Sequence, residues 1–178
     1  MNLRKLAQII NADYLHISND VEIKWLLTDS RSLSFPDESL FFAIRTERND
    51  GHKYVTELYS RGLRFFVISN FQEGYEKLTD AVFLQVSDTL KALQKVAIAH
   101  RSAFKIPIIG ITGSNGKTIV KEWLYQLLHF DVNVLRSPRS YNSQIGVPLS
   151  VWLLNENNEI GIFEAGISKV GEMQYAES

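Results

Sequence analysis

A glycine-rich stretch that ends in lysine and threonine is the part of this chain with the clearest chemistry. Residues 110–118 read GITGSNGKT, between an apolar run at 106–109 and a segment with helical periodicity at 119–124. Where a strand enters a glycine-rich turn that opens a helix, backbone N–H groups and the helix N-terminus point at one place and favour an anion there. The sequence therefore predicts a binding site for the phosphates of a nucleoside triphosphate.

The residue types in this loop suit the separate parts of that chemistry. Gly113 and Gly116 permit a positive φ and a close approach of the backbone to phosphate oxygens. Lys117 would place a positive charge at the β- and γ-phosphates, and Thr118 would offer its hydroxyl to Mg²⁺. The strict phosphate-loop pattern would have glycine at Ile111, so we expect a variant of that loop; the alternative is a turn that only connects a strand to a helix. The predicted nucleotide-binding residues are Gly113, Ser114, Asn115, Gly116, Lys117 and Thr118.

The elements around the loop alternate between strand and helix. Apolar periodicity predicts strands at 108–112, 132–135 and 159–164, and helices at 117–128 and 148–154. This alternation implies a parallel sheet with crossover helices, and ligands bind such sheets at the carboxyl ends of the strands.

Glu164 ends the last of these strands, at the edge of the sheet where the phosphate loop should also lie. A carboxylate at this place can hold Mg²⁺ against phosphate oxygens, which is the second component that a phosphoryl-transfer site requires. The alternative is that Glu164 is the first solvated residue after a buried strand. Because Glu164 and the loop would meet at one edge, the sequence favours the metal-binding interpretation.

The part of the chain before the loop is predicted to be a small mixed α/β region. Its predicted helices span 3–10, 54–59 and, from an N-cap at Asp88, 88–104; its predicted strands span 14–17, 23–27, 40–44, 63–68 and 82–86. Pro107 restricts the residue before it to extended geometry, so we expect a hinge there and two domains, 1–104 and 105–178.

Composition limits the classes of function. Of the 178 residues, 45% are hydrophobic and 22% are charged, as in an ordinary globular protein. Lys and Arg number 19 against 20 acidic residues, so no overall basic field would recruit nucleic acid. The lack of cysteine excludes disulfides, thiolate zinc sites and cysteine nucleophiles. Polar residues interrupt the N-terminus too early for a signal peptide and no apolar run is long enough for a membrane span, so we expect a cytoplasmic protein without a membrane partner.

Some other conspicuous side chains favour structural roles. His52 lies in an Asp-Gly-His turn, which is more typical of a helix start than of a phosphate ligand. Trp25, Trp123 and Trp152 lie within apolar segments, so they are predicted to be core residues.

Several segments, in order along most of the chain, resemble the Mur ligases, the enzymes that add amino acids to the UDP-linked peptidoglycan precursor. The loop at 112–118 resembles the ATP loop of that family, including its variant glycine spacing. Upstream, TDSR at 28–31, LFFA at 40–43 and DGHKY at 50–54 are similar to the UDP-binding N-terminal domain of the members that act third and fourth in the pathway.

Two further segments resemble one branch of the family more than the other. YNSQIGVPLS at 141–150 and EAG at 164–166, with GE at 171–172, are similar to the members that add D-alanyl-D-alanine. The diamino-acid-adding members carry a threonine-rich loop and serines at these places. The resemblance leaves open a parent protein that is fused to an alanine racemase.

The resemblance implies a reaction and a set of residues for it. ATP with Mg²⁺ would phosphorylate the terminal carboxylate of UDP-N-acetylmuramoyl-tripeptide, and D-alanyl-D-alanine would attack the acyl phosphate. Lys117 and Glu164 would be the catalytic residues, while Thr118 and Glu164 would position Mg²⁺. The residues implied for substrate binding are Ser30, Arg45, Thr46, Arg48, Asn142 and Ser143. The family usually has glycine where Thr46 stands, so the geometry of that loop is expected to differ.

The family also uses a histidine metal ligand, a modified lysine and a C-terminal domain, and the resemblance places all three beyond Ser178. We therefore expect a fragment, inactive as a ligase by itself, that comprises the UDP-binding domain and the first half of a parallel-sheet P-loop ATPase domain. An exposed strand edge in such a half-sheet would favour a dimer. Three other hypotheses stay open: a diamino-acid-adding Mur ligase, a complete phosphate-loop kinase or NTPase, and a non-catalytic UDP-binding module.

Overall fold

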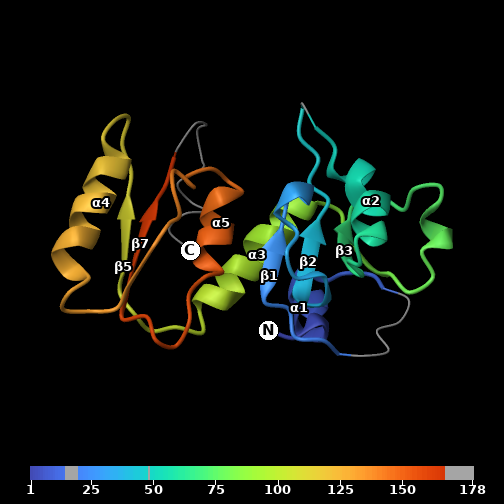
Figure 1. Cartoon of the computed structure of the whole chain (residues 1–178), viewed down its shortest axis with the longest axis horizontal. Coiled ribbons are helices and arrows are strands. Elements are labelled where there is room, and N and C mark those ends of the chain that lie inside the picture. The colour runs from blue at the N-terminus through green and yellow to red at the C-terminus, as the bar shows by residue number, and fades with distance from the viewer. Residues whose placement is uncertain (15–19, 48, 167–178) are drawn as a thin grey trace. The chain divides into compact units, whose positions relative to one another are not determined.

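The computed structural model describes residues 1–14, 20–47 and 49–166. The chain divides into two compact units, Met1–Val96 and Ala97–Ser178, and each contains its own parallel β-sheet (Figure 1). This architecture confirms the α/β class predicted from the sequence. The division falls inside helix α3 (Thr89–Arg101), upstream of the boundary at 104/105 expected from Pro107, which stays a prediction.

A four-stranded parallel sheet organises the first unit. Its strands, in spatial order, are β1 (Trp25–Leu27), β2 (Ser39–Phe42), β3 (Phe65–Ile68) and β4 (Val82–Gln85). The two central strands are buried along their whole length, which explains why they are apolar almost throughout rather than alternating. The four strands predicted between residues 23 and 86 are confirmed with small shifts of their ends. The strand predicted at 14–17 lies almost entirely outside the described residues.

Helices precede, connect and follow these strands. Helix α1 (Leu3–Ile10) and helix α2 (Val55–Ser60) occupy the positions predicted from their apolar stripes. At α3 the predicted N-cap is confirmed, because Asp88 Oδ1 accepts the N–H groups of Leu90 and Lys91 at 2.9 and 3.0 Å. The shorter 3₁₀ helices are η1 (Ser30–Ser32), η2 (Pro36–Glu38), η3 (Gly51–Tyr54) and η4 (Tyr75–Lys77). Among the described residues, no helix combines the length and apolar composition that a membrane span requires.

The core of the first unit forms where the sheet meets α2 and η4. Phe41 and Phe66 are fully buried, and Tyr75 stacks on Phe83 with ring centroids 5.1 Å apart. The buried cluster consists of Leu27, Phe41, Ala43, Val55, Leu58, Leu63, Phe66, Ile68, Tyr75 and Leu78. Packing of this kind positions the loops at the strand ends, where the first unit's predicted substrate residues lie.

A three-stranded parallel sheet, in the order β5-β7-β6, organises the second unit. Its elements in chain order are β5 (Ile108–Ile111), α4 (Lys117–Leu128), β6 (Val134–Arg136), α5 (Gly146–Val151) and β7 (Ile160–Glu164). Helices α4 and α5 lie on opposite sides of the sheet (Figure 1). The predicted alternation is confirmed, and α4 has its predicted bounds. Because the last strand in sequence lies between the other two, the end of β7 meets the end of β5.

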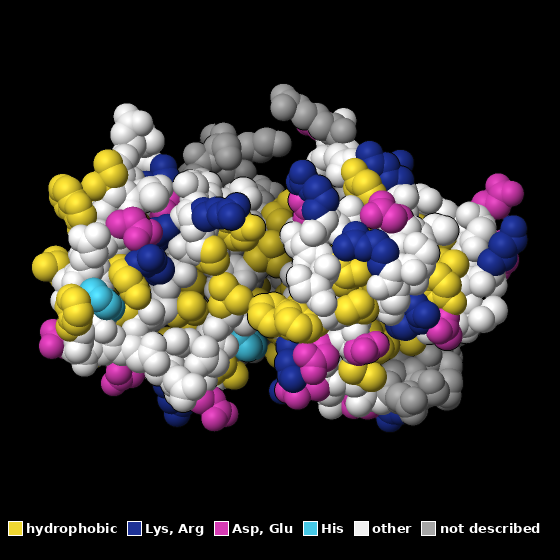
Figure 2. All heavy atoms as spheres, viewed as in Figure 1, with side chains coloured by type: hydrophobic (Ala, Val, Ile, Leu, Met, Phe, Trp, Pro, Cys, Tyr) yellow, Lys and Arg dark blue, Asp and Glu magenta, His cyan; other side chains and the backbone are white. Residues whose placement is uncertain are grey.

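Two of the three tryptophans predicted in the core lie on the surface. Trp25 is 42% exposed and stacks on Phe35, and Trp123 is 64% exposed on α4, whereas Trp152 is 7% exposed. Figure 2 shows apolar side chains gathered over α4. The prediction was wrong because an apolar segment shows which side chains are apolar but not which elements cover them. The exposed apolar residues on α4 and just after it are Ile119, Val120, Trp123, Leu127 and Phe130.

Candidate functional site

The glycine-rich loop links the end of β5 directly to the start of α4. Gly113 has φ 137° and Gly116, the N-cap of α4, has φ 79°, conformations that side chains other than glycine rarely adopt. A Cβ at either glycine would meet no atom within 4 Å, so glycine is required here by backbone conformation and not by crowding. The loop residues 112–116 are exposed. The N-terminus of the 12-residue helix α4 is open and follows a glycine turn, which suits it to bind phosphate.

Lys117 and Thr118 begin α4 and face different partners. The Lys117 ammonium donates to the Gly113 carbonyl at 2.5 Å, which closes the loop on itself. The Thr118 hydroxyl donates to Glu164 Oε2 at 3.0 Å. Sequence reasoning placed these residues in one site, and the structure brings the loop, Thr118 and Glu164 together.

Glu164 lies at the end of β7, paired in register with Ile111 at the end of β5. Its side chain is 0% exposed, so the alternative that it is a solvated residue after the strand is wrong. Its backbone N–H donates to the buried Ser137 hydroxyl at 3.3 Å. The parallel register therefore delivers a buried carboxylate to the base of the phosphate loop.

Lys121 is the residue of this site that sequence reasoning missed. Its side chain is 0% exposed, and its Nζ lies 2.8 Å from Glu164 Oε1. The ammonium also donates to the carbonyls of Ser137, at 2.9 Å, and Arg139. The ion pair with Glu164 lacks hydrogen-bond alignment, so Glu164 Oε1 has no hydrogen-bond partner among the described residues. The available signal was spacing, because Lys121 lies one turn after Thr118 and so shares its helix face.

The loop between β6 and α5 carries the other predicted residues of this unit. Asn142 is partly exposed and its carbonyl accepts the Gly166 N–H at 2.7 Å. Ser143 is exposed, and its hydroxyl accepts the Gly146 N–H at 3.1 Å. Asn142 thus lies beside the end of β7, the strand that carries Glu164, and Ser143 follows it in the loop.

In the first unit, the structure places Ser30, Arg45 and Thr46 in loops after strands. Ser30 is 6% exposed and begins η1, and its carbonyl accepts the Arg61 guanidinium at 2.7 Å. The exposed Arg45 forms an ion pair with Asp50 at 3.2 Å. Arg48 lies outside the described residues.

The backbone of Thr46 is not left-handed. Among the described non-glycine residues a positive φ occurs at Asn11 and Arg139, so Thr46 keeps an ordinary conformation. The Thr46 hydroxyl accepts the Asn49 N–H at 3.1 Å, and its own N–H donates to the Asn49 carbonyl at 2.8 Å. The side chain therefore closes this turn, and the difference from the family's loop expected from the sequence stays a prediction.

His52 has a structural role, as the sequence favoured. Its side chain is 0% exposed, with Nδ1 2.6 Å from Asp50 Oδ1 and with Nε2 accepting the Ser69 N–H at 3.0 Å. Burial by itself would raise the pKa of Asp50, but hydrogen bonds from the N–H and the ring of His52 outweigh it, so that pKa lies below its usual value. The ring joins the Asp-Gly-His turn to Ser69 through its two nitrogens.

Comparison with known proteins decides the family. The family model described as the Mur ligase middle domain matches residues 111–178, the part of the chain that contains the loop and Glu164. Curated relatives and solved structures named as members match most of the chain. The chain belongs to the Mur ligase family.

Two similar curated relatives have the same name. The chain is 38% identical over 158 residues to the UDP-N-acetylmuramoyl-tripeptide–D-alanyl-D-alanine ligase of Synechocystis sp., covering 89% of this chain and 34% of that protein. It is 36% identical over 155 residues to the ligase of the same name from Bacillus subtilis, covering 85% of this chain and 32% of that protein. The chain thus spans about a third of the length of these relatives.

Solved structures of this Mur ligase type have the same fold. MurF from Acinetobacter baumannii superposes with a TM-score of 0.85 at 26% identity, over 97% of this chain and 37% of that one. MurF from Thermotoga maritima in complex with ADP superposes with a TM-score of 0.73 at 27% identity, over 86% of this chain and 34% of that one. A parallel-sheet fold was therefore correctly predicted from the sequence.

Proposed function

We propose that this Mur ligase chain binds ATP and Mg²⁺ at the loop Gly113–Thr118. One observation carries the proposal: an exposed glycine turn with Lys117 at its end lies against a buried carboxylate, Glu164, that accepts a hydrogen bond from Thr118. The similar MurF of known structure that was solved in complex with ADP supports the identity of the nucleotide.

The residues at the loop fit Mg²⁺. Thr118 and Glu164 supply hard oxygen donors: Glu164 Oε2 accepts from the Thr118 hydroxyl, and the buried Glu164 Oε1, without a hydrogen-bond partner among the described residues, forms an ion pair with the Lys121 ammonium at 2.8 Å. Within the same described ranges, no cluster of three or more His, Cys, Asp or Glu side chains could hold a metal alone. This suits Mg²⁺, which proteins usually hold through one or two carboxylates together with substrate phosphates and water. When bound there, the ion would neutralise charge on the phosphates.

We propose that the full-length protein uses this site to join D-alanyl-D-alanine to UDP-N-acetylmuramoyl-tripeptide in peptidoglycan synthesis, a cytoplasmic reaction. The terminal carboxylate of the tripeptide would attack the γ-phosphorus of ATP, and the bond to ADP would break. The amine of D-alanyl-D-alanine would then attack the acyl carbon, lose a proton and displace phosphate. The backbone N–H groups of the loop and the Lys117 ammonium would hold the phosphates in line for the transfer.

The predicted substrate residues belong to this proposal. Ser30, Arg45 and Thr46, with Arg48, would hold the uridine diphosphate, because guanidinium groups match phosphate and uracil oxygens. Asn142 and Ser143 are the substrate-binding residues proposed for the second unit, and Asn142 lies next to the end of β7. In this proposal, residues 1–104 form the domain that binds the UDP precursor, and residues 105–178 belong to the domain that binds ATP. Self-association through an outer strand of the three-stranded sheet is a further prediction, which size-exclusion chromatography with light scattering checks.

Isothermal titration with ATP and Mg²⁺ tests the nucleotide site on the 178-residue chain. Lys117→Ala removes charge-assisted hydrogen bonds of about 1.5–3 kcal/mol, so the affinity for ATP should fall roughly 10- to 100-fold. Lys95→Ala, at an exposed lysine on α3, is the matched control and should leave the affinity unchanged. Equal affinities for both variants would refute the assignment of the loop.

An ATP-hydrolysis assay and a titration with UDP-N-acetylmuramoyl-tripeptide separate the other hypotheses. Hydrolysis of ATP by the chain alone, abolished by Lys117→Ala and independent of any UDP ligand, would favour a phosphate-loop NTPase. Binding of UDP-N-acetylmuramoyl-tripeptide that Ser30→Ala weakens and Lys117→Ala leaves unchanged, without any binding of ATP, would favour a UDP-binding module.

A further inference from the structure

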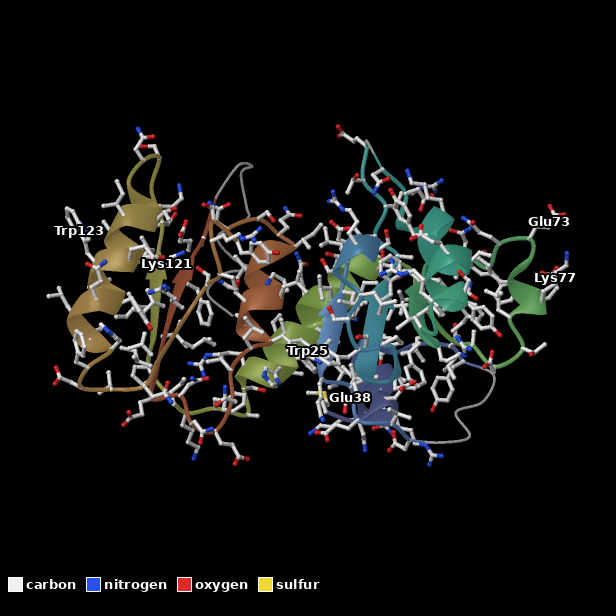
Figure 3. All side chains as sticks on the ribbon, viewed as in Figure 1. Trp25, Glu38, Glu73, Lys77, Lys121 and Trp123 are labelled. Carbon is white, nitrogen blue, oxygen red and sulfur yellow. The ribbon has the colours of Figure 1, made fainter. Side chains whose placement is uncertain are left out.

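Lys121 is a fully buried charge that the proposed reaction does not use. Figure 3 shows Lys121 on the side of α4 that faces the sheet, whereas Trp123 points away from it. A lysine ammonium has three N–H donors, and here its nearest oxygens are Glu164 Oε1 and the carbonyls of Ser137 and Arg139, with Glu122 Oε1 further away at 3.4 Å. No solvent reaches the side chain, which is 0% exposed.

Such an arrangement needs a reason, because a buried ion pair is a weak source of stability. Removing two charges from water is costly, and well-packed apolar side chains of similar volume often serve stability as well or better. A second carboxylate offsets only part of this cost. Glu122 Oε1 lies 3.4 Å from the Lys121 ammonium, a longer ion pair than the one with Glu164, and Glu122 Oε2 is paired with Arg136 at 3.1 Å.

The position of the two carbonyls supplies the reason. Ser137 and Arg139 begin the loop that carries Asn142 and Ser143 towards α5. Arg139 has φ 49°, a left-handed conformation that costs energy for an arginine, and its carbonyl accepts from Lys121. The ammonium is thus bonded to the loop at a residue whose backbone conformation is unfavourable.

The rest of the loop is confined by backbone contacts. A Cβ at Gly146 would lie 2.9 Å from the backbone of Tyr141, and a Cβ at Gly166 would lie 2.9 Å from the Asn142 carbonyl oxygen. The carbonyl of Asn142 also accepts the Gly166 N–H, two residues after Glu164. A displacement of the Glu164 carboxylate would thus reach the loop by two routes, through Lys121 and through the end of β7.

We propose that Lys121 is a positioning residue that holds the Glu164 carboxylate towards Thr118 and, with the same ammonium, holds the loop 137–143. The nucleotide–metal site and the loop predicted to contact the peptide precursor then share one charged group. This role rests on the proposed function, because it requires nucleotide and Mg²⁺ at the loop. It differs from a purely structural role because it makes the loop respond to Mg²⁺ with the nucleotide.

The first measurement uses the unmodified chain. The ¹⁵N signal of the Lys121 ammonium and the amide signals of Asn142 and Gly146 should shift when Mg²⁺ and ADP are added together. ADP without Mg²⁺ should move them by less than a third as much. If these signals shift equally with ADP alone and with ADP and Mg²⁺ together, Lys121 does not have the proposed positioning role.

The second measurement uses the fact that the chain has no cysteine. Lys121→Cys can be alkylated at this single thiol with bromoethylamine under denaturing conditions and refolded, which restores an ammonium at nearly the native length. We expect Mg²⁺ to strengthen ADP binding at least tenfold in the unmodified chain and in the alkylated variant, and less than twofold in Lys121→Met. Affinity for ADP without Mg²⁺ should stay within twofold in all three, and Lys95→Met is the control for loss of a lysine at the surface.

The outcomes separate this role from the proposed function. Lys121→Met that binds ADP and keeps the tenfold gain from Mg²⁺ would overturn the role and leave the nucleotide site intact. A lack of ADP binding by the unmodified chain would overturn the nucleotide site and the role together. If Lys121→Met does not fold, the signals of the unmodified chain decide.

Discussion

Gly146→Ala should destabilise the second unit although it places alanine in a helix. Gly146 is the first residue of α5, where alanine would ordinarily be favoured over glycine by up to about 1 kcal/mol. The new Cβ would lie 2.9 Å from both the Cα and the carbonyl carbon of Tyr141, which are backbone atoms and cannot rotate away. Overpacking of this kind costs about 1–3 kcal/mol, so the contact outweighs the helical preference and the net loss should be about 1–2 kcal/mol.

Gly110→Ala is the matched control, because a Cβ at this strand residue would meet no atom within 4 Å and its φ is ordinary. Alanine should raise stability there by about 0.5–1 kcal/mol, since glycine within a strand is entropically unfavourable. The two variants should therefore differ in sign. Scanning calorimetry should show the melting temperature of the second unit lowered by roughly 5–10 °C in Gly146→Ala and slightly raised in Gly110→Ala.

The result that would refute this reasoning is a Gly146→Ala variant as stable as Gly110→Ala. It would mean that the backbone at Tyr141 and Asn142 yields without cost. The loop 137–143 would then not be confined in the way that the role of Lys121 requires.

Three further predictions concern the buried groups. Lys121→Met leaves the Glu164 carboxylate buried without its ion-pair partner, so urea unfolding should show the second unit destabilised by about 3–5 kcal/mol. The double variant Lys121→Met with Glu164→Leu should recover most of that loss. Equal losses in the single and the double variant would contradict the pairing. Phe66→Ala, at a fully buried ring, should cost the first unit about 3–5 kcal/mol, against less than about 1.5 kcal/mol for Phe35→Ala, whose ring is 55% exposed. Burial lowers the pKa of His100 below its ordinary 6.5, although the Leu154 carbonyl bonded to its Nε2 opposes the shift. The unfolded state therefore binds the proton more readily, so the second unit should lose stability as the pH falls below about 6.5. Unfolding curves measured at several pH values should show that His100→Gln weakens this dependence of the free energy of unfolding on pH.

The local features of this protein could be predicted from its sequence because they depend on neighbouring residues. The glycines of the phosphate loop, the bounds of α4 and the Asp88 N-cap follow from backbone preferences and from side chains that reach only a few residues. The buried strand β2 follows from its nearly continuous apolar run.

Burial and pairing of distant residues were decided by the tertiary structure alone. The order β5-β7-β6, in which the last strand enters between the others, brings Glu164 beside the phosphate loop and under Lys121. Trp123 was predicted in the core because it lies within an apolar segment, and no role was predicted for Lys121, yet Trp123 is exposed and Lys121 is buried. The physical reason is that φ/ψ preferences act along the chain, whereas the cost of removing a charge or an apolar group from water depends on which distant segments cover it.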